Sequence, residues 1–178
     1  MRFSRIVIVV LAFALLFGAF SGVQAVSAVL SQAQIDSIKG SCQSIQSNLQ
    51  RLQQSDRLLR GNLGQNYDAI SQHLMAPFNS RIALNGLDGV DLTQTTVDFN
   101  VAFTTFRNDY TAYDDDLQAA LAVDCNSNPI SQYRAIQTAK QSRITVSEDA
   151  DNLNSILRDY QKQVKSFAAD QLKTTEAK

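Results

Sequence analysis

Apolar residues recur at alternating steps of three and four along three long runs of this chain. Residues three and four apart share one face of an α-helix, so each run predicts a long amphipathic helix with one buried stripe, close to a heptad seam. The three predicted helices span about residues 32–76, 92–124 and 129–171. The second stripe is largely aromatic, and its members are Phe99, Phe103, Phe106, Tyr110, Tyr113, Leu117 and Leu121.

Capping signals precede the first two predicted helices. Ser31 and Gln34 fit the S-x-x-Q capping box, in which each side chain accepts a hydrogen bond from the backbone of the other residue. Asp91 and Gln94 repeat this spacing before the second run. We therefore expect the two helices to begin just after Ser31 and Asp91.

The two prolines of the chain mark further boundaries. Asn128 and Pro129 are typical of an N-cap followed by the first helical residue, and they place the start of the third helix. Pro77 lacks a backbone N–H and its ring crowds the preceding turn, so we expect the first helix to end or kink near Ala76. The following residues, 78–91, contain two turn dipeptides and are expected to join the first helix to the second.

Amphipathic helices of this kind are unstable alone, so their stripes must pack against one another. The short connection between the second and third helices forces these two to run antiparallel. The sequence therefore predicts an all-α fold, an elongated antiparallel up-down-up three-helix bundle with coiled-coil-like packing. This bundle is expected to occupy residues 26–172 and to be followed by a frayed tail, residues 173–178.

The first residues have the layout of a secretory signal peptide. Arg2 and Arg5 form a basic region, residues 6–20 are apolar, and Val23-Gln24-Ala25 fits a small-residue cleavage pattern. We expect residues 1–25 to be a signal peptide that is cleaved after Ala25. The alternative is an uncleaved anchor, because the apolar stretch is just about long enough to span a bilayer. In both cases the rest of the chain is exported and extracytoplasmic, either secreted or held to a membrane through this segment alone.

Cys42 and Cys125 are the only cysteines of the chain. If the first two helices form an antiparallel hairpin about residues 81–86, the cysteines lie at equal distances from the turn and meet at the other end. An exported chain encounters an oxidising environment, so the sequence predicts a disulfide between them. The alternative is a pair of buried free thiols that act as small core residues. A redox-active pair is disfavoured because the C-x-x-C spacing is absent.

The acidic run Asp114-Asp115-Asp116 lies in the second predicted helix. The same hairpin geometry places it opposite positions 51–53 of the first helix, near Arg51 and one turn from Arg57. It also lies near position 138 of the third helix. One interpretation is an interhelical charge network on a solvated face, and the other is a cation site. Consecutive helix residues point about 100° apart and cannot converge on one ion, so we favour the network and predict no metal site.

The sequence contains no recognisable catalytic or cofactor-binding motif. His73 is the single histidine, and Glu148 and Glu176 are the only glutamates, which excludes a helix-bundle metal site built on Glu-x-x-His. The formal net charge of −1 provides no basic excess to hold phosphates, so nucleic acid is not expected as a partner. We therefore expect that the protein is not an enzyme and binds no cofactor.

These observations predict a non-enzymatic extracytoplasmic helical module, a structural or protein-interaction element of the cell envelope or secreted space. Its protein partner is not identified by the sequence, which also leaves the oligomeric state open. The alternative is a ligand-binding bundle, in which the aromatic residues of the second helix surround a small apolar molecule.

Overall fold

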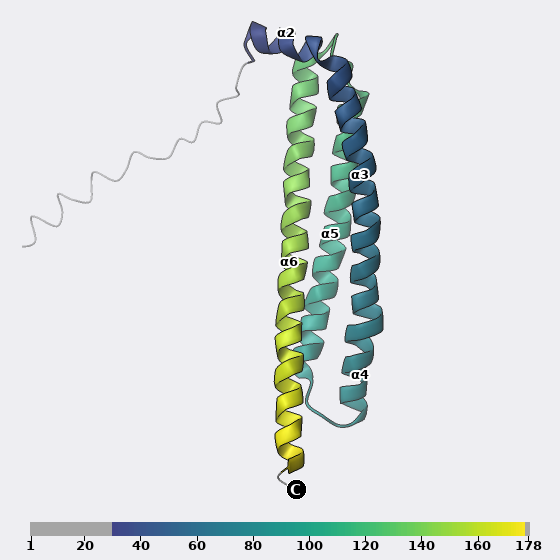
Figure 1. Cartoon of the computed structure of the whole chain (residues 1–178), viewed down its shortest axis with the longest axis vertical. Helices are drawn as coiled ribbons and strands as arrows, with labels where there is room; N and C mark the ends of the chain where they lie inside the picture. The colour runs from purple at the N-terminus through teal and green to yellow at the C-terminus, as the bar shows by residue number, and fades with distance from the viewer. Residues whose placement is uncertain (1–29, 177–178) are drawn as a thin grey trace, which may run out of the picture. The chain divides into compact units, whose positions relative to one another are not determined.

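The computed structural model describes residues 30–176, and every regular element in this range is helical (Figure 1). The all-α prediction is therefore confirmed for the described part of the chain. The expected signal peptide, residues 1–25, lies outside it. The elements are α2 (Gln32–Gly40), α3 (Cys42–Ala69), the π-helix η1 (Ile70–Met75), α4 (Ala76–Leu84), α5 (Val90–Ala122) and α6 (Pro129–Glu176).

The first helix begins where the capping box predicts. The Gln34 side chain accepts a hydrogen bond from the Ser31 backbone N–H at 2.8 Å, and the Ser31 hydroxyl accepts one from the Gln34 N–H at 3.4 Å. The helix is not continuous, however, because it breaks at Ser41 and α2 turns away from the axis of α3 (Figure 1). Gly40, a residue that weakens a helix by about 1 kcal/mol relative to alanine, is the last residue of α2, directly before this break.

Pro77 does not end the first helix near Ala76, which was one of the two expected outcomes; the helical geometry instead changes directly before the proline. The chain remains helical to Leu84, and Pro77 lies in the first turn of α4, where an N–H is not needed. The π-helix η1 directly precedes it, and the Ala76 N–H donates to the carbonyl of Ser71, five residues earlier. This wider turn shifts the carbonyls that the proline ring would otherwise meet, so the helix passes the proline.

Glycines shape the turn between α4 and α5. Gly86 has φ = 65°, a left-handed conformation that L side chains rarely adopt. Gly89 occupies the N-cap position of α5, and a Cβ there would lie 2.7 Å from a side-chain carbon of Ile82. The close approach of Ile82 thus explains why position 89 is a glycine. The expected Asp91 cap is wrong, and Asp91 lies instead in the first turn of α5, where its charge favours the helix dipole.

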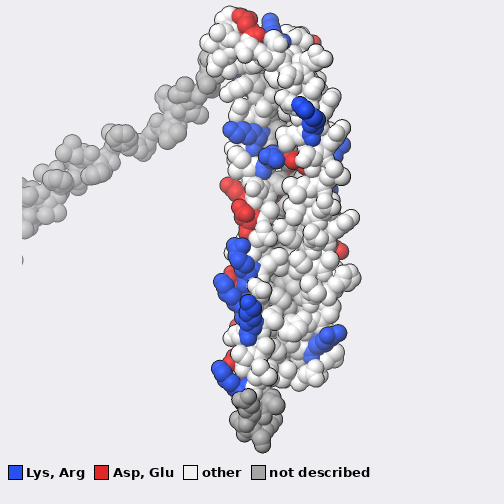
Figure 2. All heavy atoms as spheres, viewed as in Figure 1, with Lys and Arg blue, Asp and Glu red and all other residues white. Residues whose placement is uncertain are grey.

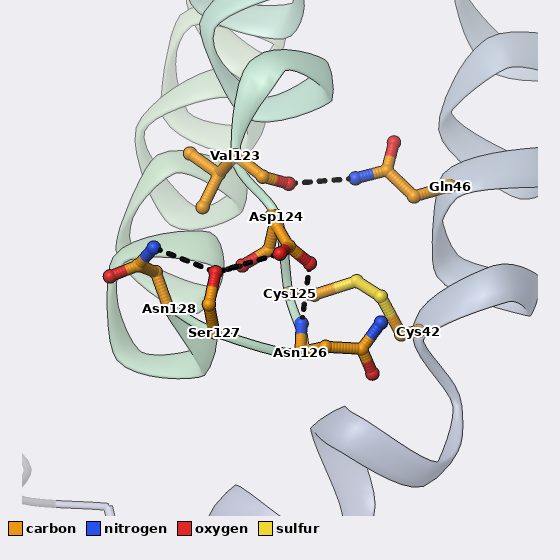
Figure 3. Close-up of a disulfide and its surroundings, with 8 residues drawn as sticks. All are labelled: Cys42, Gln46, Val123, Asp124, Cys125, Asn126, Ser127 and Asn128. Carbon is orange, nitrogen blue, oxygen red and sulfur yellow. Dashed lines mark hydrogen bonds between the residues drawn. A yellow bond between two sulfur atoms is a disulfide. The ribbon is translucent and has the colours of Figure 1, made fainter.

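The third helix starts at Pro129, directly after Asn128, as the sequence predicts. It continues to Glu176, beyond the expected end at residue 171. In the preceding connection the Asp124 carboxylate accepts hydrogen bonds from the Asn126 N–H at 2.9 Å and the Ser127 hydroxyl at 2.7 Å (Figure 3). These contacts hold the chain in a tight turn between α5 and α6.

The aromatic stripe of α5 forms the centre of the core, because α5 contacts α6 on one side and α3, η1 and α4 on the other. Phe99, Phe103 and Phe106 are buried, as predicted, and all three rings meet Tyr67 of α3 edge-on. Further along α5, Tyr113 and its neighbours form a second buried cluster toward the α5–α6 connection. That cluster comprises Leu49, Tyr110, Tyr113, Leu117, Ala120 and Ala139.

Candidate functional site

The structure pairs the two cysteines that the hairpin geometry brings together. Cys42 is the first residue of α3 and Cys125 lies in the α5–α6 connection, and their Cα atoms are 5.5 Å apart in a disulfide (Figure 3). The Cys125 side chain is fully buried. A second link lies one turn away, where the Gln46 amide donates a hydrogen bond to the Val123 carbonyl at 3.0 Å. The first turns of α3 are thus tied to the α5–α6 connection.

The acidic run of α5 points in three directions. Asp114 accepts two hydrogen bonds from the Arg57 guanidinium of α3, at 3.0 and 3.1 Å, and this contact lowers the pKa of Asp114. Asp116 accepts a hydrogen bond from Ser142 of α6, whereas Asp115 is exposed. The run therefore joins α5 to both neighbouring helices. Among residues 30–176, no three His, Cys, Asp or Glu side chains converge so as to hold a metal ion.

A buried polar cluster joins one residue from each of α3, α5 and α6. Asp56 is only 7% exposed. Its Oδ2 accepts a hydrogen bond from the Tyr113 hydroxyl at 2.7 Å and another from Nε of Arg143 at 2.7 Å. A second guanidinium nitrogen of Arg143 donates to Oδ1 at 3.3 Å. The three side chains thus form a cross-helix clamp, which we call the Asp56 cluster.

The electrostatics of the Asp56 cluster keep its two donor groups protonated. Burial, and then the hydrogen bond to Asp56, raises the pKa of the Tyr113 hydroxyl above its ordinary value, so Tyr113 stays a hydrogen-bond donor. The hydrogen bond to Asp56 raises the pKa of the Arg143 guanidinium, which stays charged. Both oxygens of Asp56 thus accept hydrogen bonds from side chains that remain protonated.

The three-and-four pattern does not predict this cluster, although the sequence contains a signal for it. Asp56 stands where the three-and-four pattern of the first helix requires an apolar residue, between Leu52 and Leu59. Arg143 likewise lies in the polar middle of the third stripe. A charged residue at a stripe position is a sign of a buried polar contact, because an unpaired charge there would be strongly destabilising.

A cavity of about 190 Å³ lies beside the Asp56 cluster and is partly open to solvent. Three residues of the aromatic stripe line it, namely Phe106, Tyr110 and Tyr113. The α3 side contributes Leu59, Arg60 and Leu63, and the α6 side contributes Val146, Ser147 and Ala150. The guanidinium carbon of Arg60 lies 4.8 Å from the centre of the Tyr110 ring, in a cation–π contact. The cavity therefore combines an apolar lining with charged groups at one end.

A carboxyl pair lies elsewhere on the seam between α5 and α6. Burial, and then the neighbouring Asp109, raises the pKa of Asp149 to about 6. One oxygen of Asp149 is buried without a hydrogen-bond partner. When protonated, Asp149 can donate to Asp109, and this contact relieves the repulsion between two carboxylates. The only histidine, His73, is exposed on η1 and lies outside the Asp56 cluster and its cavity.

Large apolar side chains are exposed around the α4–α5 turn and along the first part of α5. We define the hairpin surface as Leu84, Leu87, Val90, Val97 and Val101. Leu84 is 86% exposed, Val90 73% and Val101 63%. Three of its members, Leu87, Val90 and Val97, border a shallow hollow of about 410 Å³. Figure 2 shows that charged side chains gather along the α6 edge of the visible face, while the surface over the end of α3, η1 and α4 carries few.

Comparisons of the chain with protein-family models, with curated proteins and with solved structures gave no match. In residues 30–176, no helix is both long enough and apolar enough to cross a bilayer. The interpretation of the protein therefore depends on its own residues and their geometry.

Proposed function

We propose that the protein is a non-enzymatic helical module that works outside the cytoplasm, as a structural or protein-interaction element of the cell envelope or of the secreted space. The disulfide between Cys42 and Cys125 supports this location, because such bonds persist in oxidising compartments. The basic and apolar N-terminal sequence, with a cleavage pattern at Ala25, supports export.

The helices are interpreted as an up-down-up bundle with three arms and coiled-coil-like packing. The arms are α2 to α4, then α5, then α6, and the stripe of α5 packs between the other two. At about 1.5 Å per residue, the 33 residues of α5 span roughly 50 Å. A cross-linked rod of this length suits a role in spacing or presenting a surface.

The hairpin surface is the observation that carries the interaction proposal. Single exposed apolar residues are ordinary, but a cluster beside a hollow is typical of a protein–protein contact site. The cluster lies around the α4–α5 turn, away from the disulfide, so the cross-linked end can be anchored while the turn meets a partner.

Affinity capture from the native envelope with tagged protein tests this proposal. The triple variant Leu84→Ser, Val97→Ser and Val101→Ser is expected to lose its captured partner. The matched control replaces Ile130, Ile144 and Leu172, which are exposed aliphatic residues of α6, by serine. Circular dichroism first verifies that both variants are folded. Equal capture by both variants, or no specific capture by the unmodified protein, would contradict the proposal.

A second candidate function is the binding of a small apolar molecule, and the cavity beside the Asp56 cluster favours it. The cavity is lined by the aromatic residues of α5 that the sequence suggested for such a site, Phe106, Tyr110 and Tyr113. Mass spectrometry of protein purified under native conditions would detect a bound molecule. Protein that carries none and takes up no apolar probe would contradict this candidate.

A further inference from the structure

We propose that the cavity beside the Asp56 cluster binds a small monoanion with a compact apolar body, such as an aromatic carboxylate. This inference rests on the second candidate function and adds to it the size and the charge of the ligand. It follows from the volume of the cavity, from the balance of charges at its wall, and from the way in which one arginine is held.

The volume sets the size of the ligand. Pockets for drug-sized molecules measure about 300–1,000 Å³, whereas this cavity measures about 190 Å³. An apolar protein cavity of about 150 Å³ holds benzene. The space therefore fits a single ring or a short branched chain, with little room beyond the head group. The apolar body would contact Leu63, Phe106, Val146 and Ala150.

The balance of charges sets the charge of the ligand. The charged residues that line the cavity are Asp56, Arg60 and Arg143. Asp56 and Arg143 neutralise each other through two hydrogen bonds. Arg60 forms no ion pair within the described residues, and the nearby Asp114 is already occupied by Arg57. Among the lining residues, the positive charge of Arg60 is thus the one without an ion-pair partner, and a ligand with one negative charge matches it.

The position of Arg60 suits recognition of a carboxylate. Its guanidinium lies over the ring of Tyr110, and Tyr110 is itself buried and packed edge-on against Tyr113 at 5.7 Å between ring centres. The cation–π contact restricts the guanidinium to the cavity wall while leaving its N–H donors at the ring edge available. A planar guanidinium binds a carboxylate through two parallel hydrogen bonds. Ser147, on the α6 side, offers a neutral hydroxyl donor.

The chain contains a matched control for Arg60. Arg107 also lies over an aromatic ring, with its guanidinium carbon 5.8 Å from the centre of the Phe103 ring. It lines a different surface hollow, between α3 and α5, and not the cavity beside the Asp56 cluster. Replacing either arginine removes one charge and one cation–π contact, but only Arg60 can affect a ligand in this cavity.

Titration calorimetry of the purified exported protein, with its disulfide intact, tests the inference. The probes are phenylacetate, its neutral isostere phenylacetamide and the cation phenylethylammonium. Phenylacetate is expected to bind at least about tenfold more tightly than phenylacetamide, with no detectable binding of the cation. Arg60→Gln should remove this preference, whereas Arg107→Gln should change the affinity less than about twofold. Ser147→Phe, at an exposed position on the cavity wall, should fill the cavity and abolish binding of both probes.

The outcomes separate the charge inference from the binding function on which it rests. Equal binding of phenylacetate and phenylacetamide, unchanged by Arg60→Gln but lost in Ser147→Phe, would overturn the monoanion inference and leave an apolar site in place. Binding that survives Ser147→Phe would place the ligand elsewhere and overturn the inference. If neither probe binds at millimolar concentration, both the monoanion inference and the second candidate function are wrong.

Discussion

Replacing Asp56 by alanine should destabilise the protein far more than replacing Asp114, although each aspartate accepts two hydrogen bonds from an arginine. Asp56→Ala removes the one hydrogen-bond acceptor that the Tyr113 hydroxyl has among the described residues, and Tyr113 is only 2% exposed. Leaving such a donor unsatisfied costs about 1–3 kcal/mol. Arg143 loses a charged partner too, but its side chain is 52% exposed and can be solvated, so this part of the loss is smaller than in a fully buried pair.

The sum for Asp56→Ala is a loss of about 2–4 kcal/mol in the free energy of unfolding, against at most about 1 kcal/mol for Asp114→Ala. Urea denaturation followed by circular dichroism measures both, provided that the slope with urea concentration is unchanged. Tyr113→Phe in the Asp56→Ala background should recover part of the loss, because it removes the orphaned donor. The reasoning is refuted if Asp56→Ala costs no more than Asp114→Ala, or if Tyr113→Phe makes the Asp56 variant still less stable.

Three further predictions concern the core, the cross-link and the carboxyl pair. Phe106→Ala should lower the free energy of unfolding by about 3–5 kcal/mol, because the ring is 1% exposed and packs edge-on against Tyr67 in the core. An unchanged melting transition in calorimetry would contradict this prediction. Cys42→Ser and Cys125→Ser should each cost about 4–5 kcal/mol in the chain-entropy model for a separation of 83 residues, and the double variant little more, as denaturation of each variant will reveal. Since burial raises the pKa of Asp149 to about 6, the folded state binds more protons than the unfolded state between about pH 4 and 6, so stability should fall as pH rises through this range. Asp149→Asn should remove this fall and stabilise the protein at pH 7 by about 1–2 kcal/mol, which urea midpoints from pH 4 to 8 would test.

The features that the sequence predicted correctly are those set by periodicity and by counting along the chain. Phe103 and Phe106 are core residues because a helix repeats its buried face regardless of fine detail. Cys42 and Cys125 meet because an antiparallel hairpin fixes which residues lie at equal distances from its turn. Both inferences tolerate an error of one or two residues in the helix boundaries.

The features that the sequence did not predict depend on local conformations of nearly equal energy. At Pro77 the chain can stop, kink or insert a wider turn, and the sequence pattern does not distinguish these outcomes; the structure has the π-helix, with Met75 buried at its end. The Asp56 cluster depends on the exact rotation of three helices, which a periodicity of three and four does not specify. Asp56 and Arg143 were visible as polar interruptions of two stripes, but their pairing required the register of α3 against α6.

The position of the disulfide has a consequence for how the protein would bear mechanical load. If tension is applied between Gln32 and Glu176, the bond between Cys42 and Cys125 carries the force directly from the start of α3 to the α5–α6 connection. The segment from Cys42 to Cys125, which contains α3, η1, α4 and α5, therefore bears no tension while the disulfide is intact. At about 3.5 Å per extended residue, the disulfide prevents roughly 290 Å of contour length in this segment from being stretched. The extension measured in single-molecule stretching should therefore increase by about that length when a reductant is added.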